Sequence, residues 1–287
     1  MSPPGGLELG ITLSRTARSP WDVGSVVAVI ARHPYLERTG LAAMAHRGGA
    51  LEAAENTRAG FEHAVRAGYL YIETDVQVTR DGVAVLFHDD HLDRTTDAKG
   101  SVSSLTWAEL RRVGTHAGTD QIMRLDEALE GFPDQRFNLD LKSDRAVEPV
   151  LDVLVALRAT PRVLVGSFSD ERLRTVRRRL GPTLATSAGP REVARAVIAS
   201  RGLGSANSPA LALQVPVSMR GVPVVSARLI AQAHARRQEV HVWTVNDEPE
   251  MRRLLDLGVD GIVTDRPTLL RQVLEDRGQW HHPTRPT

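Results

Sequence analysis

The sequence has 287 residues and not one cysteine. A disulfide framework, a thiolate metal site and a thiol nucleophile are therefore all excluded. If the protein binds a metal ion, the ligands have to be carboxylate and imidazole side chains. Because 41% of the residues are hydrophobic, a chain of this length can still bury a sizeable core.

Long apolar runs are also lacking, and none approaches the roughly 20 residues that a membrane-spanning helix needs. The best candidate, residues 23–31, is short and contains Gly24 and Ser25. It follows charged residues, an arrangement loosely similar to that of a signal peptide. We favour a first helix that packs under the domain, and we therefore expect a cytoplasmic protein with no transmembrane segment.

Neither sign of charge is in excess, because 36 Lys and Arg residues stand against 35 Asp and Glu residues. The formal net charge of +1 gives no reason to expect a nucleic-acid or anionic-membrane partner. Lysine itself is scarce, since only Lys99 and Lys142 occur. Lys142 falls at the end of a predicted strand, which suggests a role for a compact cation there, with chance as the alternative.

Apolar segments alternate with segments of helical periodicity from residue 41 onward. The expected strands cover 41–45, a hairpin within 69–89, 135–141, 162–165, 183–186, 211–215, 240–245 and 261–264, with a short extra strand at 222–225. The expected helices cover 57–67, 106–113, 126–130, 147–158, 170–180, 191–199, 227–237, 250–257 and 269–276. About eight strands, each followed by a helix or helical connection, predict a single (β/α)8 TIM barrel of the α/β class. A doubly wound sheet is less favoured, because no G-x-G-x-x-G follows the first strand.

The ends of the chain differ from this pattern. Residues 1–40 are at first rich in Gly, Pro and Ser and lack sustained periodicity, so we assign them to an N-terminal extension. The barrel domain is expected to cover residues 41–277, and residues 278–287 are expected to form a disordered tail. His281 and His282 in that tail are more plausible as exposed side chains than as metal ligands.

The predicted helix at 170–180 carries five arginines: Arg172, Arg174, Arg177, Arg178 and Arg179. Such a stripe can indicate phosphate or nucleic-acid binding. However, Leu173, Val176 and Leu180 recur at three- and four-residue steps and form the buried face. We therefore expect the arginines to lie in water.

The stretch YLYIETDVQVTRDGVAVLFHD predicts a β-hairpin, because apolar and β-branched residues flank the turn signal Asp81-Gly82. For a two-residue turn, the numbers of paired residues sum to 163, which places Asp75 opposite His88. Glu73 lies two residues before Asp75, so both carboxylates face the same side of the strand. A longer loop would shift this register.

Polar residues recur at the ends of the predicted strands. They are His46 and Arg47 at the end of the first strand, Glu73 and Asp75 on the second with His88 beside them, Asn138, Asp140 and Lys142 on the third, Trp243 and Asn246 at the end of the seventh, and Asp265 after the eighth. In a TIM barrel the carboxyl ends of the strands form the mouth that holds the active site. The polar residues of the core strands are therefore expected to gather at that mouth.

Three carboxylates at one place would repel one another and raise their own pKa values unless a cation joined them. Oxygen ligands without cysteine favour a hard ion, Ca²⁺ or Mg²⁺, over Zn²⁺. His46 and His88 would then suit an acid/base pair, although they could instead complete a transition-metal site. Arg47 and Lys142 add positive charge that would hold an anionic substrate, most plausibly a phosphate ester. Each residue alone could equally have a structural role.

Several motifs together resemble the glycerophosphodiester phosphodiesterase family. They are HRGG (46–49), ENT (55–57), ETDVQVTRDGVAVLFHD (73–89), LDRTT (92–96), NLDLK (138–142), VWTVN (242–246) and GVDGIVTDRP (258–267). The resemblance covers roughly residues 41–272, which is most of the chain. Two departures are Asp140, where the family often has Glu, and Ala54, where it commonly has Pro.

The resemblance implies a TIM barrel with one divalent cation, often Ca²⁺ or Mg²⁺. By position, it makes Glu73, Asp75 and Asp140 the metal ligands and His46 and His88 the acid/base pair. It also implies that Arg47 and Lys142 contact phosphate, and that Trp243 lines the pocket for the alcohol. The shorter side chain of Asp140 leaves the metal preference open.

The expected reaction is metal-dependent hydrolysis of a small-molecule glycerophosphodiester to sn-glycerol 3-phosphate and an alcohol. One alternative is a lysophospholipase D-like activity on the same barrel, which an exposed apolar rim near Trp243 would support. The other alternative is a non-catalytic barrel that binds a phosphorylated ligand. The two histidines argue against that, because a binding module needs no proton-transfer pair.

Overall fold

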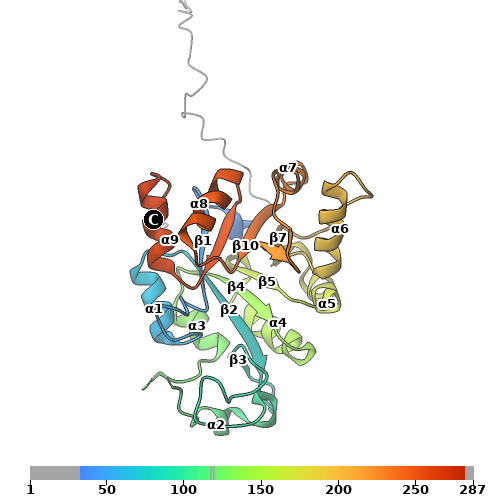
Figure 1. Cartoon of the computed structure of the whole chain (residues 1–287). Coiled ribbons are helices and arrows are strands. Elements are labelled where there is room, and N and C mark those ends of the chain that lie inside the picture. Colours follow the sequence, from blue (N-terminus) through green and yellow to red (C-terminus); the bar gives the residue numbers. More distant parts are fainter. Residues whose placement is uncertain (1–32, 117, 119, 282–287) are drawn as a thin grey trace, which may run out of the picture. The chain divides into compact units, whose positions relative to one another are not determined.

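The computed structural model describes residues 33–116, 118 and 120–281. Its centre is a sheet of eight parallel strands, and a ninth strand pairs antiparallel with one of them. The parallel strands are β1 (Ala42–His46), β2 (Tyr71–Val78), β4 (Arg136–Leu141), β5 (Val163–Gly166), β6 (Ala185–Thr186), β7 (Ala212–Pro216), β10 (Glu239–Trp243) and β11 (Gly261–Thr264). They follow the order β6-β5-β4-β2-β1-β11-β10-β7, and a parallel bridge between Ser187 and Ala212 joins the two ends. The predicted TIM barrel is confirmed (Figure 1).

Helices connect the strands, as the periodicity predicts (Figure 1). The α-helices are α1 (Arg58–Arg66), α2 (Trp107–Leu110), α3 (Leu125–Gly131), α4 (Val147–Ala156), α5 (Asp170–Leu180), α6 (Pro190–Ser200), α7 (Ala227–Ala235), α8 (Glu248–Leu257) and α9 (Pro267–Asp276). Short 3-10 helices cover Pro34–Leu36, Val102–Ser104, Asp144–Ala146, Thr160–Arg162 and Gly181–Thr183. Helix α5 has its predicted bounds, whereas α2 ends three residues earlier than predicted. Within the described ranges, no helix is both long and apolar enough to cross a bilayer.

Alternation along the strands separates the core from the site. On β4, Phe137, Leu139 and Leu141 are buried in the apolar layer that the helices cover. Asn138 and Asp140 alternate with them and line a cleft on the other side of the strand. Successive residues of a strand point to opposite faces, so one short sequence supplies both the core and the polar interior of the barrel.

The hairpin register differs from the prediction by one residue. Strand β3 (Ala84–Leu86) pairs with β2 so that Val76 faces Leu86 and Val78 faces Ala84, and the paired numbers sum to 162. The register differs because the loop has three residues, 80–82, instead of two. The Thr79 amide donates to the Val83 carbonyl at 3.0 Å and closes this loop. Gly82 occupies the left-handed region at φ 86°, as such loops require.

This shift corrects the predicted pairing of Asp75 with His88. The amide of Phe87 donates to the carbonyl of Asp75 at 3.1 Å, so Phe87 takes the position opposite Asp75. His88 lies just beyond β3, in a bend, and still lines the same cleft as Asp75. The chain turn, rather than strand alternation, therefore brings His88 to the site.

The barrel begins earlier than the predicted boundary at residue 40. Tyr35 is fully buried, and its ring packs edge-on against Tyr71 of β2. Arg38 makes two hydrogen bonds to the carboxylate of Glu239, at 3.0 and 2.8 Å. Residues 33–40 are therefore part of the amino-terminal end of the barrel, while the expectations for residues 1–32 lie outside the described residues.

The predicted tail also begins later than residue 278. The amides of Gln279 and Trp280 donate to the carbonyl of Leu274 in α9, and the Trp280 ring packs against Tyr69. His281 is exposed, as predicted, whereas His282 lies outside the described residues. The predicted extra strand near residue 222 is found as β9 (Val222–Pro223), which pairs with β8 (Ser218–Met219) in a small separate hairpin.

Not all the arginines of α5 lie in water. Arg177 binds the carboxylate of Glu192 through two hydrogen bonds of 3.0 Å, and its side chain is largely buried. Arg172 donates to Asp144 and to the carbonyl of Leu141. The prediction is thus wrong for these two residues, because acceptors on neighbouring elements of the barrel lie within reach of the long side chains.

Candidate active site

The carboxyl ends of the barrel strands open into a cleft of about 750 Å³. All the site residues expected from the sequence line it: His46, Arg47, Glu73, Asp75, His88, Asp140, Lys142 and Trp243. Strand register explains most of this convergence. His46 pairs with Glu73 across β1 and β2, and Asp75 pairs with Asp140 across β2 and β4. Residues at the same level of adjacent parallel strands lie side by side, so the polar groups form rows across the mouth.

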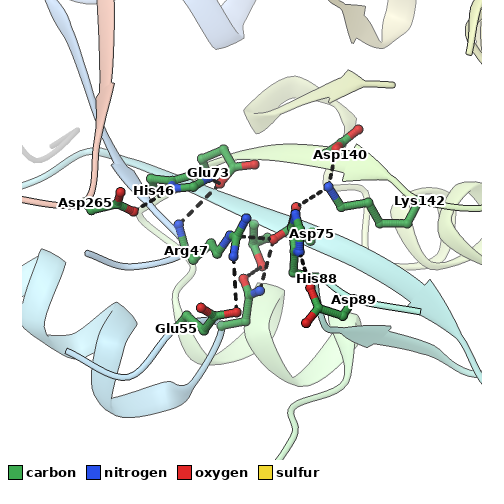
Figure 2. Close-up of polar contacts among 12 residues, drawn as sticks. His46, Arg47, Glu55, Glu73, Asp75, His88, Asp89, Asp140, Lys142 and Asp265 are labelled. Carbon is green, nitrogen blue, oxygen red and sulfur yellow. Dashed lines mark hydrogen bonds and ion pairs between the residues drawn. The ribbon is translucent and has the colours of Figure 1, made fainter. Parts of the chain in front are cut away.

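Each of the two histidines has one ring nitrogen held by a carboxylate (Figure 2). Nδ1 of His46 lies 2.6 Å from Oδ1 of Asp265, and Nδ1 of His88 lies 2.5 Å from Oδ1 of Asp89. A carboxylate at Nδ1 fixes the orientation of the imidazole and places the donor proton on that nitrogen. In both residues Nε2 is then the nitrogen left for proton transfer.

Asp265 is itself held in place. The side-chain amide of Asn246 donates to its Oδ2 at 2.7 Å, and the Asp265 amide donates to the side-chain carbonyl of Asn246 at 2.8 Å. Burial opposes the charge on His46, but the charge of Glu73 and the hydrogen bond with Asp265 outweigh it and raise the pKa of His46. His46 is thus tuned toward the protonated form by two acidic neighbours.

The carboxylates of the site differ in how well their charges are compensated. Asp75 lies 2.7 Å from Nζ of Lys142 and 3.0 Å from Nε of Arg47. Burial alone would raise its pKa, but these two cations lower it below the usual range. Glu73 is only 7% exposed, and burial followed by the charge of Asp75 raises its pKa to about 7. Among the described residues, the nearest cationic partner of Glu73 is His46, whose Nε2 lies 3.7 Å from Oε2 of Glu73, so its charge is less well compensated than that of Asp75.

Arg47 and Lys142 both bind carboxylates. Lys142 bridges Asp75 and Asp140, with 2.7 Å from Nζ to an oxygen of each (Figure 2). Arg47 contacts both Asp75 and Glu55, and its Nη1 lies 3.2 Å from Oε1 of Glu55. The expected phosphate-binding cations thus already sit among the expected metal ligands, and a substrate or metal ion has to compete with these ion pairs.

Within the part of the chain that the structure describes, no group of three or more His, Cys, Asp or Glu side chains is arranged to hold a metal ion. The chemistry of the donors nevertheless fits a hard cation. Glu73 is a buried carboxylate whose partners are the Arg47 amide, at 3.3 Å, and the His46 imidazole, at 3.7 Å. Oδ1 of Asn138, which pairs with Glu73 across the strands, is buried without a hydrogen-bond partner. Buried oxygen atoms of this kind cost free energy unless a donor or a cation meets them.

Asn56, Glu55 and Arg94, which were not predicted as site residues, bind side chains that line the site or the partners of those side chains. Asn56 donates to Oδ2 of Asp75 at 3.1 Å and accepts from the hydroxyl of Thr74. Glu55 binds Arg94 at 2.6 Å, and Arg94 in turn binds Asp89 at 2.6 Å. The hydrogen bond from Arg94 is the main reason that the pKa of Asp89 falls to about 2.

A signal for these residues was present in the sequence. Asn56 and Glu55 belong to the ENT motif, and Arg94 to the LDRTT motif. The motifs contributed to the resemblance, but only the fold shows that they connect Arg47 to His88 through a chain of ion pairs.

The other half of the cleft is lined mainly by apolar side chains. The ring of Trp243 packs edge-on against Phe168, with 5.6 Å between the ring centroids. Helix α6 and the β8–β9 hairpin continue this wall with Val193, Ala194, Val197, Ile198, Met219 and Val222. The cleft thus joins a charged end, at β1, β2 and β4, to an apolar trough.

Residues 46–269 match the model of the glycerophosphoryl diester phosphodiesterase family. The chain belongs to this family. It is therefore an enzyme of the phosphoric diester hydrolase class, and the resemblance noted in the sequence is confirmed. The match extends over all the residues expected to act at the mouth of the barrel.

Individual relatives agree with this assignment. The chain is 40% identical over 256 residues to "Probable glycerophosphodiester phosphodiesterase 2" of Mycobacterium tuberculosis, covering 86% of this chain and 95% of the relative. It is 27% identical to a lysophospholipase D of Rattus norvegicus, covering 81% and 86% of the two chains. A solved structure from Silicibacter pomeroyi DSS-3 that carries the family name superposes with a TM-score of 0.73 at 27% identity, covering 87% of this chain and 100% of that one.

Proposed function

We propose that this family member hydrolyses glycerophosphodiesters to sn-glycerol 3-phosphate and an alcohol at the charged end of the cleft. The observation that carries the proposal is the pair of histidines, each with Nδ1 fixed by a carboxylate, beside the row of Glu73, Asp75 and Asp140. A phosphate-binding module needs the cations but not two oriented imidazoles. A non-catalytic barrel is thereby disfavoured.

The two histidines divide the proton transfers between them. Nε2 of one accepts the proton of the attacking oxygen, which belongs to water or to a neighbouring hydroxyl of the substrate. Nε2 of the other donates a proton to the alcohol oxygen as its bond to phosphorus breaks. When water attacks, the proton gained at one imidazole and the proton lost at the other balance in a single step. When the neighbouring hydroxyl attacks, the alcohol leaves and a cyclic phosphate forms, which water opens in a second step with the two histidines in exchanged roles.

Glu73, Asp75 and Asp140 would hold one divalent cation, Ca²⁺ or Mg²⁺, and Oδ1 of Asn138 lies beside them as a further oxygen donor. When bound, the cation would neutralise charge on the phosphoryl oxygens. Arg47 and Lys142, relieved of part of their pairing with Asp75 and Asp140, would bind those oxygens directly. Trp243, which lines the cleft, would form part of the pocket for the alcohol.

The test is a turnover assay on a panel of glycerophosphodiesters, run on chelated enzyme and again after Ca²⁺ or Mg²⁺ is restored. Liberated sn-glycerol 3-phosphate is measured directly. We expect turnover to be lost on chelation and to return with one of the two ions. Full turnover by the chelated enzyme would contradict the role of the carboxylates, and absence of turnover under every condition would contradict the proposed reaction.

A second candidate is lysophospholipase D-like hydrolysis, favoured by the apolar trough that continues from Trp243 along α6. An acyl chain would fill this trough while the phosphodiester lies at the charged end. The rat relative named above carries that activity in its name. Comparing kcat/KM for a lysophospholipid with that for glycerophosphocholine separates the two candidate functions. Only the lysophospholipid has an acyl chain that can bind in the trough, so only its kcat/KM should benefit from the trough.

A further inference from the structure

The charge of the chain is unevenly distributed. Residues 190–238 contain seven arginines, no lysine and a single acid, Glu192, which gives this segment a formal charge of +6. The whole chain carries only +1, so the remaining residues sum to −5. An overall balance therefore conceals a strongly basic region, which covers α6, the β8–β9 hairpin and α7.

The single acid of this region does not offset its surface charge. Glu192 is 8% exposed, and Arg177 of α5 holds both of its carboxylate oxygens at 3.0 Å. Arg201 and Arg220, which line the trough, have no carboxylate partner among residues 33–116, 118 and 120–281. Elsewhere on the surface, by contrast, Arg252 and Arg253 of α8 each bind an acid.

Large exposed apolar side chains gather at the same place. Of the eight that the described residues contain, four line the cleft on its trough side: Phe168, Ile198, Met219 and Val222. A fifth, Leu203, lies next to Ile198, because its amide donates to the Ile198 carbonyl at 3.4 Å. Phe168 is 67% exposed and Met219 is 56% exposed. Single exposed apolar residues are ordinary, but a cluster around a cleft indicates a surface that something else covers. We refer to these five residues with Arg201 and Arg220 as the trough rim.

Helix α6 has one face that is buried against the barrel and another face that borders the trough. Ala196 and Ala199 are buried against the barrel, whereas Ala194, Ile198 and Arg201 lie on the opposite side and border the trough. This second face carries apolar and basic side chains and no acid. Apolar residues flanked by unpaired arginines are the pattern by which a protein lies on an anionic lipid surface, the apolar groups entering the interface and the cations meeting the headgroups.

We propose that the trough rim docks the enzyme on an anionic lipid surface. Charge complementarity selects this occupant, because the rim is basic while the rest of the chain is acidic in sum. The trough leads from the rim to the phosphodiester site, so a docked enzyme would present its active site to lipid substrates. This last consequence rests on the proposed function, whereas docking itself does not.

The experiment is co-sedimentation of the full chain with vesicles of phosphatidylcholine alone and of phosphatidylcholine mixed with phosphatidylglycerol. We expect binding to the anionic vesicles only, and weaker binding as salt is added. The double variant Arg201→Gln/Arg220→Gln should bind roughly 30-fold more weakly, the combined effect of two arginines at an anionic surface. Met219→Ser/Val222→Ser, on the exposed hairpin, should also weaken binding.

The matched control is Arg252→Gln/Arg253→Gln, which removes the same charge from α8 and should bind like the unmodified chain. Turnover of a water-soluble glycerophosphodiester should be unchanged in this control. Co-sedimentation is measured without turnover, so loss of docking is distinguished from loss of the proposed reaction. Equal binding to both kinds of vesicle, or equal loss in the control, would overturn the proposal. A dimer in light scattering that the rim variants abolish would likewise replace it with a protein interface.

Discussion

Each end of the barrel carries a cluster of carboxylate, histidine and basic side chains, but the ratio of acidic to basic groups differs between the two clusters. At the amino-terminal end, Glu239 accepts two hydrogen bonds from Arg38 and a third contact of 2.8 Å from His241. His241 is fully buried, and the side chain of Arg38 is 7% exposed. One carboxylate there serves two buried nitrogen groups, and we call this cluster the closed end, although the side chain of Glu239 itself is 21% exposed.

At the carboxyl end the balance is reversed. Glu73, Asp75 and Asp140 outnumber Arg47 and Lys142, and the cluster opens into the cleft. Glu73 is left with a pKa of about 7 because burial and the charge of Asp75 both disfavour its ionised form. At the closed end the ion pairs of Glu239 stabilise the fold. At the open end the carboxylates are only partly compensated by cations, and they can therefore bind a cation or take part in the reaction. This difference predicts that substitutions at the closed end reduce stability, whereas substitutions at the open end reduce turnover.

The largest expected effect is on stability, at the closed end. Glu239→Ala leaves Arg38 and His241 buried without their common acceptor, which should lower the free energy of unfolding by about 3–5 kcal/mol. Denaturant unfolding measures this change. Glu248→Ala, which removes an exposed partner of Arg252, should shift the midpoint much less. A shift for Glu239→Ala no larger than that of the control would remove the distinction between the two ends.

The next effect is on catalysis, at the open end. His46→Ala and His88→Ala should each lower kcat by roughly 10²-fold or more, because each removes one of the two proton transfers. Circular dichroism and thermal unfolding should stay close to those of the unmodified protein. His234→Ala changes a half-exposed histidine bound to Asp260 and should leave kcat unchanged. Near-normal turnover in either site variant would exclude that residue from the mechanism.

A smaller effect should follow from the carboxylates behind the histidines. Asp265→Asn and Asp89→Asn should lower kcat by roughly tenfold or more with little change in KM, because the imidazoles lose orientation while the substrate contacts remain. Asp97→Asn, at the exposed His116–Asp97 pair, is the matched control. If KM rose while kcat held, these aspartates would act on substrate binding rather than on the histidines.

The sequence predicts the barrel and the gathering of the site for a clear physical reason. Glu73 and Asp75, like Asp140 and Lys142, are two residues apart, and that spacing alone places each pair on one face of a parallel strand. The hairpin register fails because Asp81-Gly82 does not by itself decide between a two- and a three-residue loop. Loop length depended on the Thr79–Val83 pairing, which composition does not reveal.

Contacts between distant parts of the chain were beyond sequence reasoning. Asp265 is 219 residues from His46, and Glu239 is 201 residues from Arg38. Asp265 was expected at the mouth, but only barrel closure brings it to a particular histidine. Arg38 was assigned to an extension, because nothing in the local pattern of residues 33–40 indicates that β10 supplies a buried acceptor.

The smallest expected effect concerns pH and again separates the two ends. Burial would raise the pKa of Glu239, but its hydrogen bond with His241 and the charges of His241 and Arg38 lower it below the usual value. A carboxyl with a depressed folded-state pKa contributes stability above its unfolded pKa, near 4.3, and loses it as the pH falls through the folded value. Unfolding of the unmodified protein and of Glu239→Gln, followed from pH 7 downward, should therefore converge as the solution becomes acidic. A stability difference that stayed constant down to the acid transition would show that Glu239 acts through packing rather than through its charge.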